Sequence, residues 1–352
     1  MYITPNNFLS IGSAYPLREF LHRNKLISNI INFGENKVFS PVMTYNVIIE
    51  LNKQNKTGFK YYKVPKVNLK EIKTLLNNKL KWIDINYESL NNDAWKLTSK
   101  QVTSNLEKIE NIGVRIKDRI RTGIATLRDK IYIVEGSKEE GFYKIVNGIK
   151  YEIEKEVLSP LYKVSRIKTE KDIEKYRSFI IFPYKLSEGK YKVITEIMFV
   201  TNYPNAYKYL LTQKDILIER DKGKNKYKEW FEYGRSQGLN NRGLKLLHPT
   251  FSNVPKFMLL PDKNALYNNG YSINCKDGEE QWIQKVLNSK IMKYYIDHTS
   301  YPISGGYMCY QKKYIQDFSI PNFTKEEKDY LIAEKNKEGI DEFLQKKYNL
   351  VF

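Results

Sequence analysis

Cysteine and histidine are scarce in this chain, and their scarcity argues against several kinds of site. Only two cysteines, Cys275 and Cys309, and three histidines occur among 352 residues. The cysteines form no C-x-x-C pair, and no histidine stands at metal-ligand spacing from another ligand. The sequence therefore indicates neither a zinc site nor a disulfide framework, and a reducing compartment suits it.

Long apolar runs and cofactor-binding motifs are also missing. No stretch approaches the roughly 18 apolar residues that span a bilayer, and the first residues, MYITPNNF, lack the shape of a signal peptide. We therefore expect a cytoplasmic protein. No P-loop and no G-x-G-x-x-G is present, and we predict neither a catalytic residue nor a metal site within this chain.

Positive charge is what the chain has in excess. Lys and Arg number 59 against 40 Asp and Glu, which gives a formal net charge of +19. Twenty-eight Tyr and 16 Phe are interleaved with these cations. Such a field, with flat rings beside cations, favours a polyanionic partner such as nucleic acid. A genome biased toward Lys, Asn, Ile and Tyr would give similar totals, so composition alone leaves both explanations open.

The most informative basic segment, 113–134, surrounds a turn of small residues, 122–126 (TGIAT). The basic side chains that precede or flank this turn are Arg115, Lys117, Arg119, Arg121 and Arg128. Arg, Lys, Thr and exposed backbone amides suit contacts to phosphates and bases. The alternative is an ordinary solvated basic loop, which the spacing does not exclude.

Secondary-structure patterns divide the chain into four parts. In residues 1–65 the pattern predicts a strand, a helix and two further strands, followed by a polar segment at 52–66. This is an α/β fragment too short to close its own sheet. Residues 66–105 predict a helix at 68–80 and then a weakly patterned linker. We expect 106–320 to be a mostly β domain and 321–352 a helical tail that begins at the capping residue Thr324.

Several elements are predicted within the first and third parts. Asn147-Gly148 between two apolar segments predicts a hairpin over 142–153 with a type I′ turn. Strands are predicted at 131–134, 179–184 and 193–200, a helix at 203–212, a helix at 279–296 and an extended segment at 314–321. In the first helix, we expect Leu17, Phe20 and Leu21 to share one face.

An ordered set of segments resembles a known family. These segments are TPNNF, PLREFL, IINFGENKVFSPVMTYNVIIEL, RTGIATLRDKIYIV, VLSPLYK, FIIFPY, LLTQKDILIERDK, YKEWFEYGR, VLNSKIMKYYI and SGGYMCYQKKYIQDFSIPN. Together they resemble the carboxyl-terminal part of adenine-N6 DNA methyltransferases of the TaqI and Eco57I type, enzymes of restriction–modification systems. No single segment is specific, but the ordered set extends over nearly the whole chain.

The resemblance implies an α+β fold: a small α/β remnant of a Rossmann-like methyltransferase domain, followed by a mostly β target-recognition domain with C-terminal helices. In that family an amino-terminal domain binds S-adenosylmethionine and flips the target adenine, and its N-P-P-Y lies upstream of the TPNNF segment. We therefore expect S-adenosylmethionine in the complete enzyme and none bound by this chain alone. Phe39 matches the aromatic residue that stacks on the flipped base; a core Phe beside strand 47–51 is the alternative.

The resemblance also indicates which residues contact DNA. The expected set is Arg115, Arg119, Arg121, Thr122, Thr126, Arg128, Lys163, Arg166, Lys168, Arg235, Arg242 and Tyr307. We expect Lys163, Arg166 and Lys168 to hold the phosphate backbone and Arg235 and Arg242, in an amide-rich loop, to read bases. The turn at Gly305-Gly306-Tyr307 faces DNA or acts only as a hinge.

These observations predict a chain that recognises double-stranded DNA and does not methylate it alone. A separate methyltransferase chain or a restriction subunit is the expected protein partner. If a separate chain supplies the cofactor domain, residues 1–51 complete its sheet and should form an apolar, unpaired edge. The alternatives are a stand-alone specificity subunit that directs another modification or restriction subunit, and a basic scaffold that binds no DNA.

Overall fold

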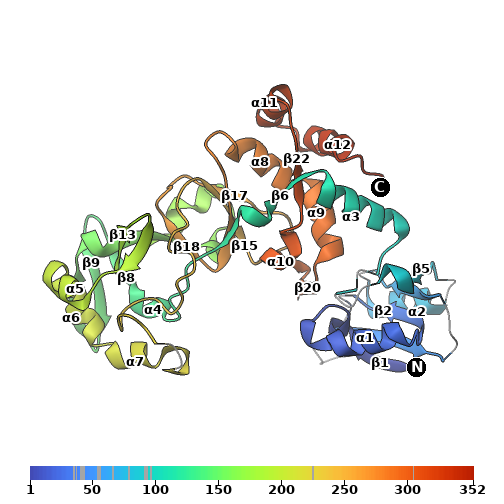
Figure 1. The fold of residues 1–352 in the computed structure, drawn as a ribbon, viewed down its shortest axis with the longest axis horizontal. Coiled ribbons are helices and arrows are strands. Elements are labelled where there is room, and N and C mark those ends of the chain that lie inside the picture. Colours follow the sequence, from blue (N-terminus) through green and yellow to red (C-terminus); the bar gives the residue numbers. More distant parts are fainter. Residues whose placement is uncertain are drawn as a thin grey trace.

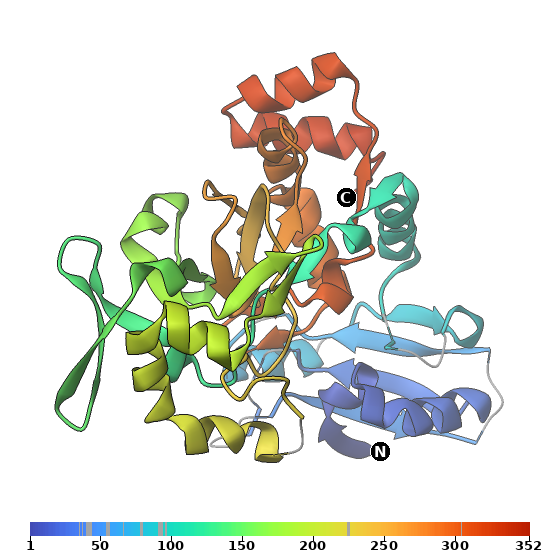
Figure 2. The same cartoon turned by 60° about the vertical axis from the view of Figure 1, so that its left-hand side comes forward.

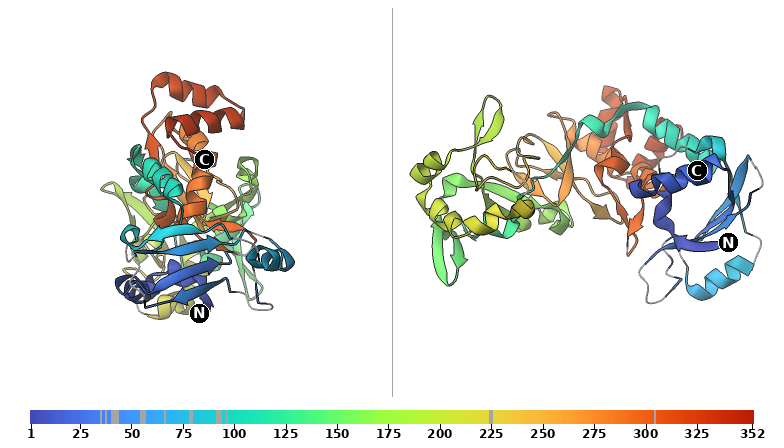
Figure 3. Two further views of the ribbon diagram at one scale, coloured as in Figure 1. Left: turned by 90° about the vertical axis from the view of Figure 1, so that its right-hand side faces the viewer. Right: turned by 60° about the horizontal axis from the view of Figure 1, so that its bottom comes forward.

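The structure is a computed structural model of the chain. It describes residues 1–34, 36, 38–39, 44–53, 57–65, 67–77, 80–90, 94–95, 97–223, 226–303 and 305–352. Three groups of elements follow the long axis (Figure 1): an amino-terminal sheet at one end, a six-stranded sheet at the other, and a four-stranded sheet with helices between them. The right-hand view of Figure 3 shows the same separation of the two ends. The mixed α and β architecture agrees with the prediction.

The amino-terminal sheet has five strands in the order β1-β3-β2-β4-β5, with only β2 and β4 parallel. Its elements are β1 (Tyr2–Pro5), α1 (Tyr15–Arg23), β2 (Ile27–Asn32), β3 (Asn46–Leu51), β4 (Gly58–Lys63), α2 (Leu69–Asn77) and β5 (Ile83–Asn86). Strand β4 lies in the segment predicted to be polar and β5 in the predicted linker. Trp95 and Leu97 also pack in this core, so it extends into residues expected to be a linker.

Helix α1 differs from the prediction in the face that it buries. Leu21 is buried, but Leu17 and Phe20 are exposed. Arg18 is buried instead, and its guanidinium donates to the carbonyls of Phe8 and Ile11 at 2.7 and 2.8 Å. The apolar side chains that the pattern assigned to the core therefore add to the molecular surface near β1.

The six-stranded sheet has the order β10-β9-β8-β12-β11-β18, and only the pair β11 and β18 is parallel. Its strands are β8 (Ile133–Ser137), β9 (Gly141–Val146), β10 (Ile149–Ile153), β11 (Leu158–Lys163), β12 (Arg177–Ile181) and β18 (Leu266–Asn268). The predicted hairpin is confirmed: Asn147 and Gly148 have φ of 49° and 79°, as a type I′ turn requires. Figure 2 shows this hairpin projecting away from the rest of the six-stranded sheet.

Short helices and a second hairpin cover this sheet. They are α4 (Asp129–Tyr132), β13 (Tyr184–Ser187), β14 (Lys190–Val193), α5 (Glu196–Asn202), α6 (Pro204–Leu211) and α7 (Lys214–Ile218). The helix predicted at 203–212 is confirmed by α6. The strand predicted at 193–200 is wrong, because β14 ends at Val193 and Thr195 then caps α5 by accepting the Met198 amide. Residues 131–132, predicted as strand, belong to α4.

The four-stranded sheet is antiparallel throughout, in the order β17-β15-β19-β7. Its strands are β7 (Ile120–Thr122), β15 (Lys245–Pro249), β17 (Met258–Leu260) and β19 (Gly270–Asn274). Two smaller ladders lie beside it, formed by β16 (Phe251–Ser252), β20 (Pro302–Ile303) and β21 (Tyr307–Cys309), and by β6 (Gly113–Arg115) and β22 (Ser319–Pro321). The largest apolar core lies between this sheet and the helices.

The remaining helices are α3 (Lys100–Asn111), α8 (Glu280–Leu287), α9 (Lys290–Thr299), α10 (Lys312–Ile315), α11 (Lys325–Ala333) and α12 (Lys337–Lys347). The single helix predicted at 279–296 is two helices, because Asn288 turns its amide to the backbone of Phe257 and a new helix begins after Ser289. The cap at Thr324 is confirmed by a capping box with Glu327. Within the described residues, no helix has the length and apolar character needed to span a membrane.

Candidate nucleic-acid interface

Two loops that are distant in sequence pair with each other, and we call them the paired loops: Thr122–Arg128 and Gly234–Gly238. The amides of Gly234 and Arg235 donate to the carbonyls of Thr126 and Ala125 at 3.0 and 3.1 Å. The side chain of Gln237 donates from Nε2 to the Gly123 carbonyl at 3.0 Å. The small-residue turn that stood out in the sequence is therefore one half of a two-stranded ribbon.

Glycines allow this close approach. A Cβ on Gly123 would lie 2.5 Å from the Tyr267 carbonyl oxygen. Gly238 has φ of 76°, and a Cβ there would lie 2.7 Å from the backbone of Gly123. A Cβ at Gly123 would push the first loop away from Tyr267, and a Cβ at Gly238 would push the two loops apart or force the chain out of its conformation.

A third and a fourth segment meet the paired loops at the turn between β18 and β19. The amide of Ile124 donates to the Tyr267 carbonyl at 2.9 Å, and Lys163 of β11 lies opposite Asn268 of β18 in the parallel ladder. Segments near residues 121–128, 163–166, 234–238 and 267–270 therefore converge, which brings together predicted DNA contacts from three separate parts of the sequence.

Several cations at this convergence are available to an anion. Arg121 and Arg128 are exposed, and among the described residues their guanidinium groups donate only to the carbonyls of their own neighbours, Ile120 and Leu127. Arg166 and Lys168 are exposed and Lys163 is half-buried. In the part of the chain that the structure describes, none of these five cations has a carboxylate within 4.0 Å. Unpaired guanidinium and ammonium groups are suited to binding phosphate.

Three predicted cations already have carboxylate partners. Arg115 pairs with Asp317 at 3.3 Å and Arg235 with Asp221 at 3.1 Å, both in exposed positions. Arg119, the third, is paired with Glu279 through both carboxylate oxygens.

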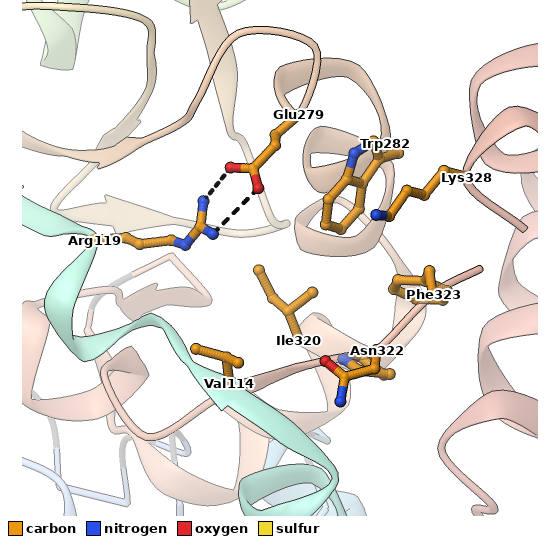
Figure 4. Close-up of a pocket in the computed structure, with 9 residues that line it drawn as sticks. Val114, Arg119, Glu279, Trp282, Ile320, Asn322, Phe323 and Lys328 are labelled. Atoms are coloured by element: carbon orange, nitrogen blue, oxygen red, sulfur yellow. Dashed lines mark hydrogen bonds and ion pairs between the residues drawn. The ribbon is translucent and has the colours of Figure 1, made fainter. Parts of the chain in front are cut away.

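The Arg119 guanidinium donates to both carboxylate oxygens of Glu279, at 2.6 and 3.4 Å. Figure 4 shows this pair on the wall of a pocket of about 170 Å³, facing Trp282 and Lys328. The hydrogen bond from the Arg119 guanidinium lowers the pKa of Glu279 below its usual range. We therefore correct the prediction for Arg119: it closes this wall and is not free to bind phosphate.

Thr126 is also corrected. Its side chain has no exposed surface, so it cannot contact DNA in this conformation. Its hydroxyl accepts the Arg128 amide at 3.0 Å and donates to Asp129. Thr126 therefore holds the loop in shape, whereas Thr122 keeps part of its surface exposed.

Arg242 has contacts within the protein in place of the expected base contact. Its guanidinium lies over the rings of Phe182 and Tyr191, 5.1 and 4.7 Å from their centroids, and donates to the Asn264 carbonyl. Burial lowers its pKa. We therefore assign Arg242 to packing against Phe182 and Tyr191, and Arg235 remains the predicted base reader in this segment.

Two predicted aromatic contacts lie away from the paired loops. Phe39 is 44% exposed, so the alternative of a core Phe is wrong, and base stacking by its ring remains a prediction. Residues 37 and 40–43 around it lie outside the described residues. Tyr307 of β21 is also 44% exposed and follows Gly305 and Gly306, both with positive φ; Ser304 lies outside the described residues.

Sequence reasoning missed part of this interface. Sequence patterns single out none of Gln237, Leu127 and the turn at 268–270. One signal was available, because Gly234-Arg235-Ser236-Gln237-Gly238 has the spacing G-x-S-x-G. That pattern marks a catalytic serine only between a strand and a helix; here it lies in a loop, and close approach explains its glycines.

No family model matches the chain. The chain is 31% identical over 325 residues to the Type II restriction enzyme and methyltransferase RM.Eco57I of Escherichia coli, an alignment that covers 84% of this chain and 32% of that protein. It is 24% identical over 362 residues to the Type II methyltransferase M.BanIII of Aneurinibacillus aneurinilyticus, covering 91% of this chain and 60% of that protein.

Among solved structures, the chain resembles the Type IIL restriction–modification enzyme MmeI in complex with DNA. The TM-score is 0.58 at 12% identity, with 99% of this chain and 47% of that chain covered, which shows a shared fold. The chain thus spans about a third of RM.Eco57I and less than two thirds of M.BanIII. The ordered segments and these similarities show that the chain resembles one part of Type II restriction–modification methyltransferases.

Proposed function

We propose that this chain recognises duplex DNA sequence-specifically, as the target-recognition part of an adenine-N6 DNA methyltransferase in a restriction–modification system. The observation that carries the proposal is the convergence of unpaired cations at the paired loops. Arg121 and Arg128 flank the first loop, and Lys163, which ends β11, and Arg166, in the turn after it, approach from the side of β18. The net charge of +19 attracts the same polyanion over longer distances.

The paired loops offer both kinds of contact that DNA recognition needs. The arginines can hold phosphate and set the orientation of the chain on the duplex. In the second loop, Ser236 is an exposed polar side chain that can bond to base edges, and so can the Oε1 of Gln237, whose Nε2 is bonded to the Gly123 carbonyl. We assign sequence reading to this second loop, together with Arg235, and phosphate binding to Arg121, Arg128, Lys163, Arg166 and Lys168.

We assign the chemistry of methyl transfer to residues outside this chain. S-adenosylmethionine would supply the methyl group in the complete enzyme. Asn32, at the carboxyl end of β2, uses its side chain within the protein, accepting from Gly34 and Asn6 and donating to Tyr61. We therefore name no residue of this chain as a cofactor ligand and derive no step through the cofactor.

The edge of the amino-terminal sheet is the proposed contact with the catalytic part. Strand β1 ends the sheet, and its Tyr2 and Ile3 are 62% and 57% exposed. Leu17 and Phe20 of α1 are exposed as well. An apolar edge with unpaired backbone groups is suited to continuation by another strand. In this arrangement Phe39 would stack on the flipped adenine.

A salt titration tests the DNA-binding function. The five unpaired cations, if each neutralises one phosphate, predict a slope of log affinity on log salt near −4.5, at about −0.9 per contact, or a loss of several hundredfold between 50 and 200 mM salt. We expect Arg121→Ala to reduce the slope by about 0.9 and Arg119→Ala, the matched ion-paired control, to leave it unchanged. No binding at low salt, or a flat response, would contradict the proposal.

A stand-alone specificity subunit is the alternative reading, and a second experiment separates the two. A chain that carries N-P-P-Y and the cofactor-binding glycines is mixed with this one, S-adenosylmethionine and duplex DNA. Methyl transfer to adenine N6 by the mixture, with none by either chain, supports the methyltransferase assignment. DNA binding without methyl transfer supports the specificity subunit.

A further inference from the structure

Leu127, at the tip of the first paired loop, has an unusual backbone conformation. Its φ is 62°, in the left-handed region. The other non-glycine residues with positive φ in the described part of the chain are all Asn, Asp, Glu or Lys. Bulky apolar side chains avoid this region because Cβ crowds the following carbonyl. The surrounding structure must therefore hold Leu127 in place.

Hydrogen bonds on both sides of Leu127 supply that constraint. The Thr126 carbonyl accepts the Gly234 amide at 3.0 Å, which fixes the residue before it. The Arg128 amide donates to the Thr126 hydroxyl at 3.0 Å, which fixes the residue after it. The backbone of Leu127 could relax only by breaking one of these bonds.

The Leu127 side chain packs against Gly234 and is nevertheless partly exposed to solvent. A Cβ at Gly234 would lie 2.4 to 2.8 Å from side-chain atoms of Leu127, so the two residues are in contact. Nevertheless, 39% of Leu127 is exposed. Arg128 follows it in the chain, and Arg235 follows Gly234, so an apolar group stands among cations at the tip of the paired loops.

A purely structural role explains this arrangement poorly. Gly or Asn would adopt the left-handed conformation at lower cost, and neither would leave an apolar surface in solvent. A leucine at this position is useful if its side chain meets a ligand that is anionic at its border and apolar at its centre. A base pair between two phosphodiester backbones has that character.

We propose that Leu127 is a specificity-determining residue that contacts the methyl group of a thymine in the major groove. The inference rests on the proposed DNA-recognition function. The methyl group is the apolar feature by which thymine differs from the other bases in that groove. Arg121 and Arg128 would hold phosphates while the constrained backbone aims the leucine at the base.

Selection from a library of randomised duplexes tests the inference. The wild-type chain should select a motif that contains an obligatory thymine. Leu127→Asn should lose the preference at that one position, bind the wild-type motif about tenfold more weakly, and melt at the same or a higher temperature. Leu127→Met should retain the preference, and Leu211→Asn, the same change at an exposed leucine of α6, should have no effect.

Deoxyuridine in place of that thymine removes only the methyl group. It should weaken binding by wild type to the same extent as Leu127→Asn, and it should have no further effect on the variant. An unchanged motif and affinity for Leu127→Asn, or an equal loss at every position, would overturn the inference. If Leu127→Asn does not fold, Leu127→Gly takes its place, and failure of both to fold would assign Leu127 a structural role and overturn it as well.

The two proposals fail in distinguishable ways. If the wild-type chain binds no duplex or selects no motif, the DNA-recognition function itself is wrong. If wild type selects a motif and Leu127→Asn selects the same one with unchanged affinity, only the role of Leu127 is wrong.

Discussion

Arg220 provides a test of what holds the second paired loop in position. It has no exposed surface, and its guanidinium donates to the Leu217 carbonyl at 2.6 Å, the Tyr132 hydroxyl at 2.8 Å and the Trp230 carbonyl at 2.7 Å. It also donates to the Glu232 carbonyl, two residues before Gly234. One side chain thus joins α4, the end of α7 and the segment that leads into the second loop.

Replacement of this guanidinium should be costly. Arg220→Met keeps an unbranched apolar side chain to about the position of Nε and removes the guanidinium with all its hydrogen bonds. Each buried acceptor left without a donor costs about 1–3 kcal/mol, and this guanidinium serves four of them. We expect the free energy of unfolding to fall by about 3–5 kcal/mol, with loss of DNA sequence preference before loss of general affinity.

Urea denaturation followed by circular dichroism measures the first effect. The midpoint should fall while the slope stays constant, because the same surface is exposed on unfolding. Arg166→Met, at an exposed arginine without an ion pair, is the control and should change stability by less than about 0.5 kcal/mol. A loss below about 1 kcal/mol for Arg220→Met would refute the claim that this network organises the loop.

Two further predictions concern other residues. Burial lowers the pKa of His248 to about 3, so below a pH of about 6.5 the unfolded chain binds a proton at this histidine that the folded chain does not bind. The contribution of His248 to the free energy of unfolding should therefore be full above that pH and decline by up to about 1.4 kcal/mol per pH unit toward pH 3. His248→Phe should flatten this part of a profile of melting temperature against pH. In selection from randomised duplexes, Arg235→Ala should relax the motif, whereas Lys163→Ala should weaken binding to all sequences equally; equal loss on selected and scrambled duplexes for Arg235→Ala would remove it from the base readers.

Local signals in the sequence were sufficient for some elements and insufficient for others. The hairpin at Asn147-Gly148 and the cap at Thr324 depend on a few adjacent residues, so they are readable without tertiary information. Strand β4, GFKYYK, buries Phe59 and Tyr61 between lysines, and its polar composition concealed it. The break between α8 and α9 depends on Asn288 and Phe257, 31 residues apart, and no helical pattern contains that information.

The same division applies to the candidate interface. The excess of cations is visible in composition, but which cations are free is not. Arg119 and Glu279 are 160 residues apart, and only the folded chain shows that they neutralise each other. Thr126 looked suited to DNA by residue type, yet burial gives it a structural role. Residue chemistry predicts the region, and long-range pairing decides which of its members reach the surface.

The turn between β18 and β19 belongs to two sheets at once, and this has a consequence for engineering. Its first strand completes the six-stranded sheet beside β11, and its second lies in the four-stranded sheet beside β7. A cassette shorter than about 121–270 cannot carry the whole binding surface from one relative to another. During synthesis, the surface also cannot assemble until the ribosome has passed Gly270. A nascent chain should therefore be unable to bind DNA until most of the chain has been synthesised.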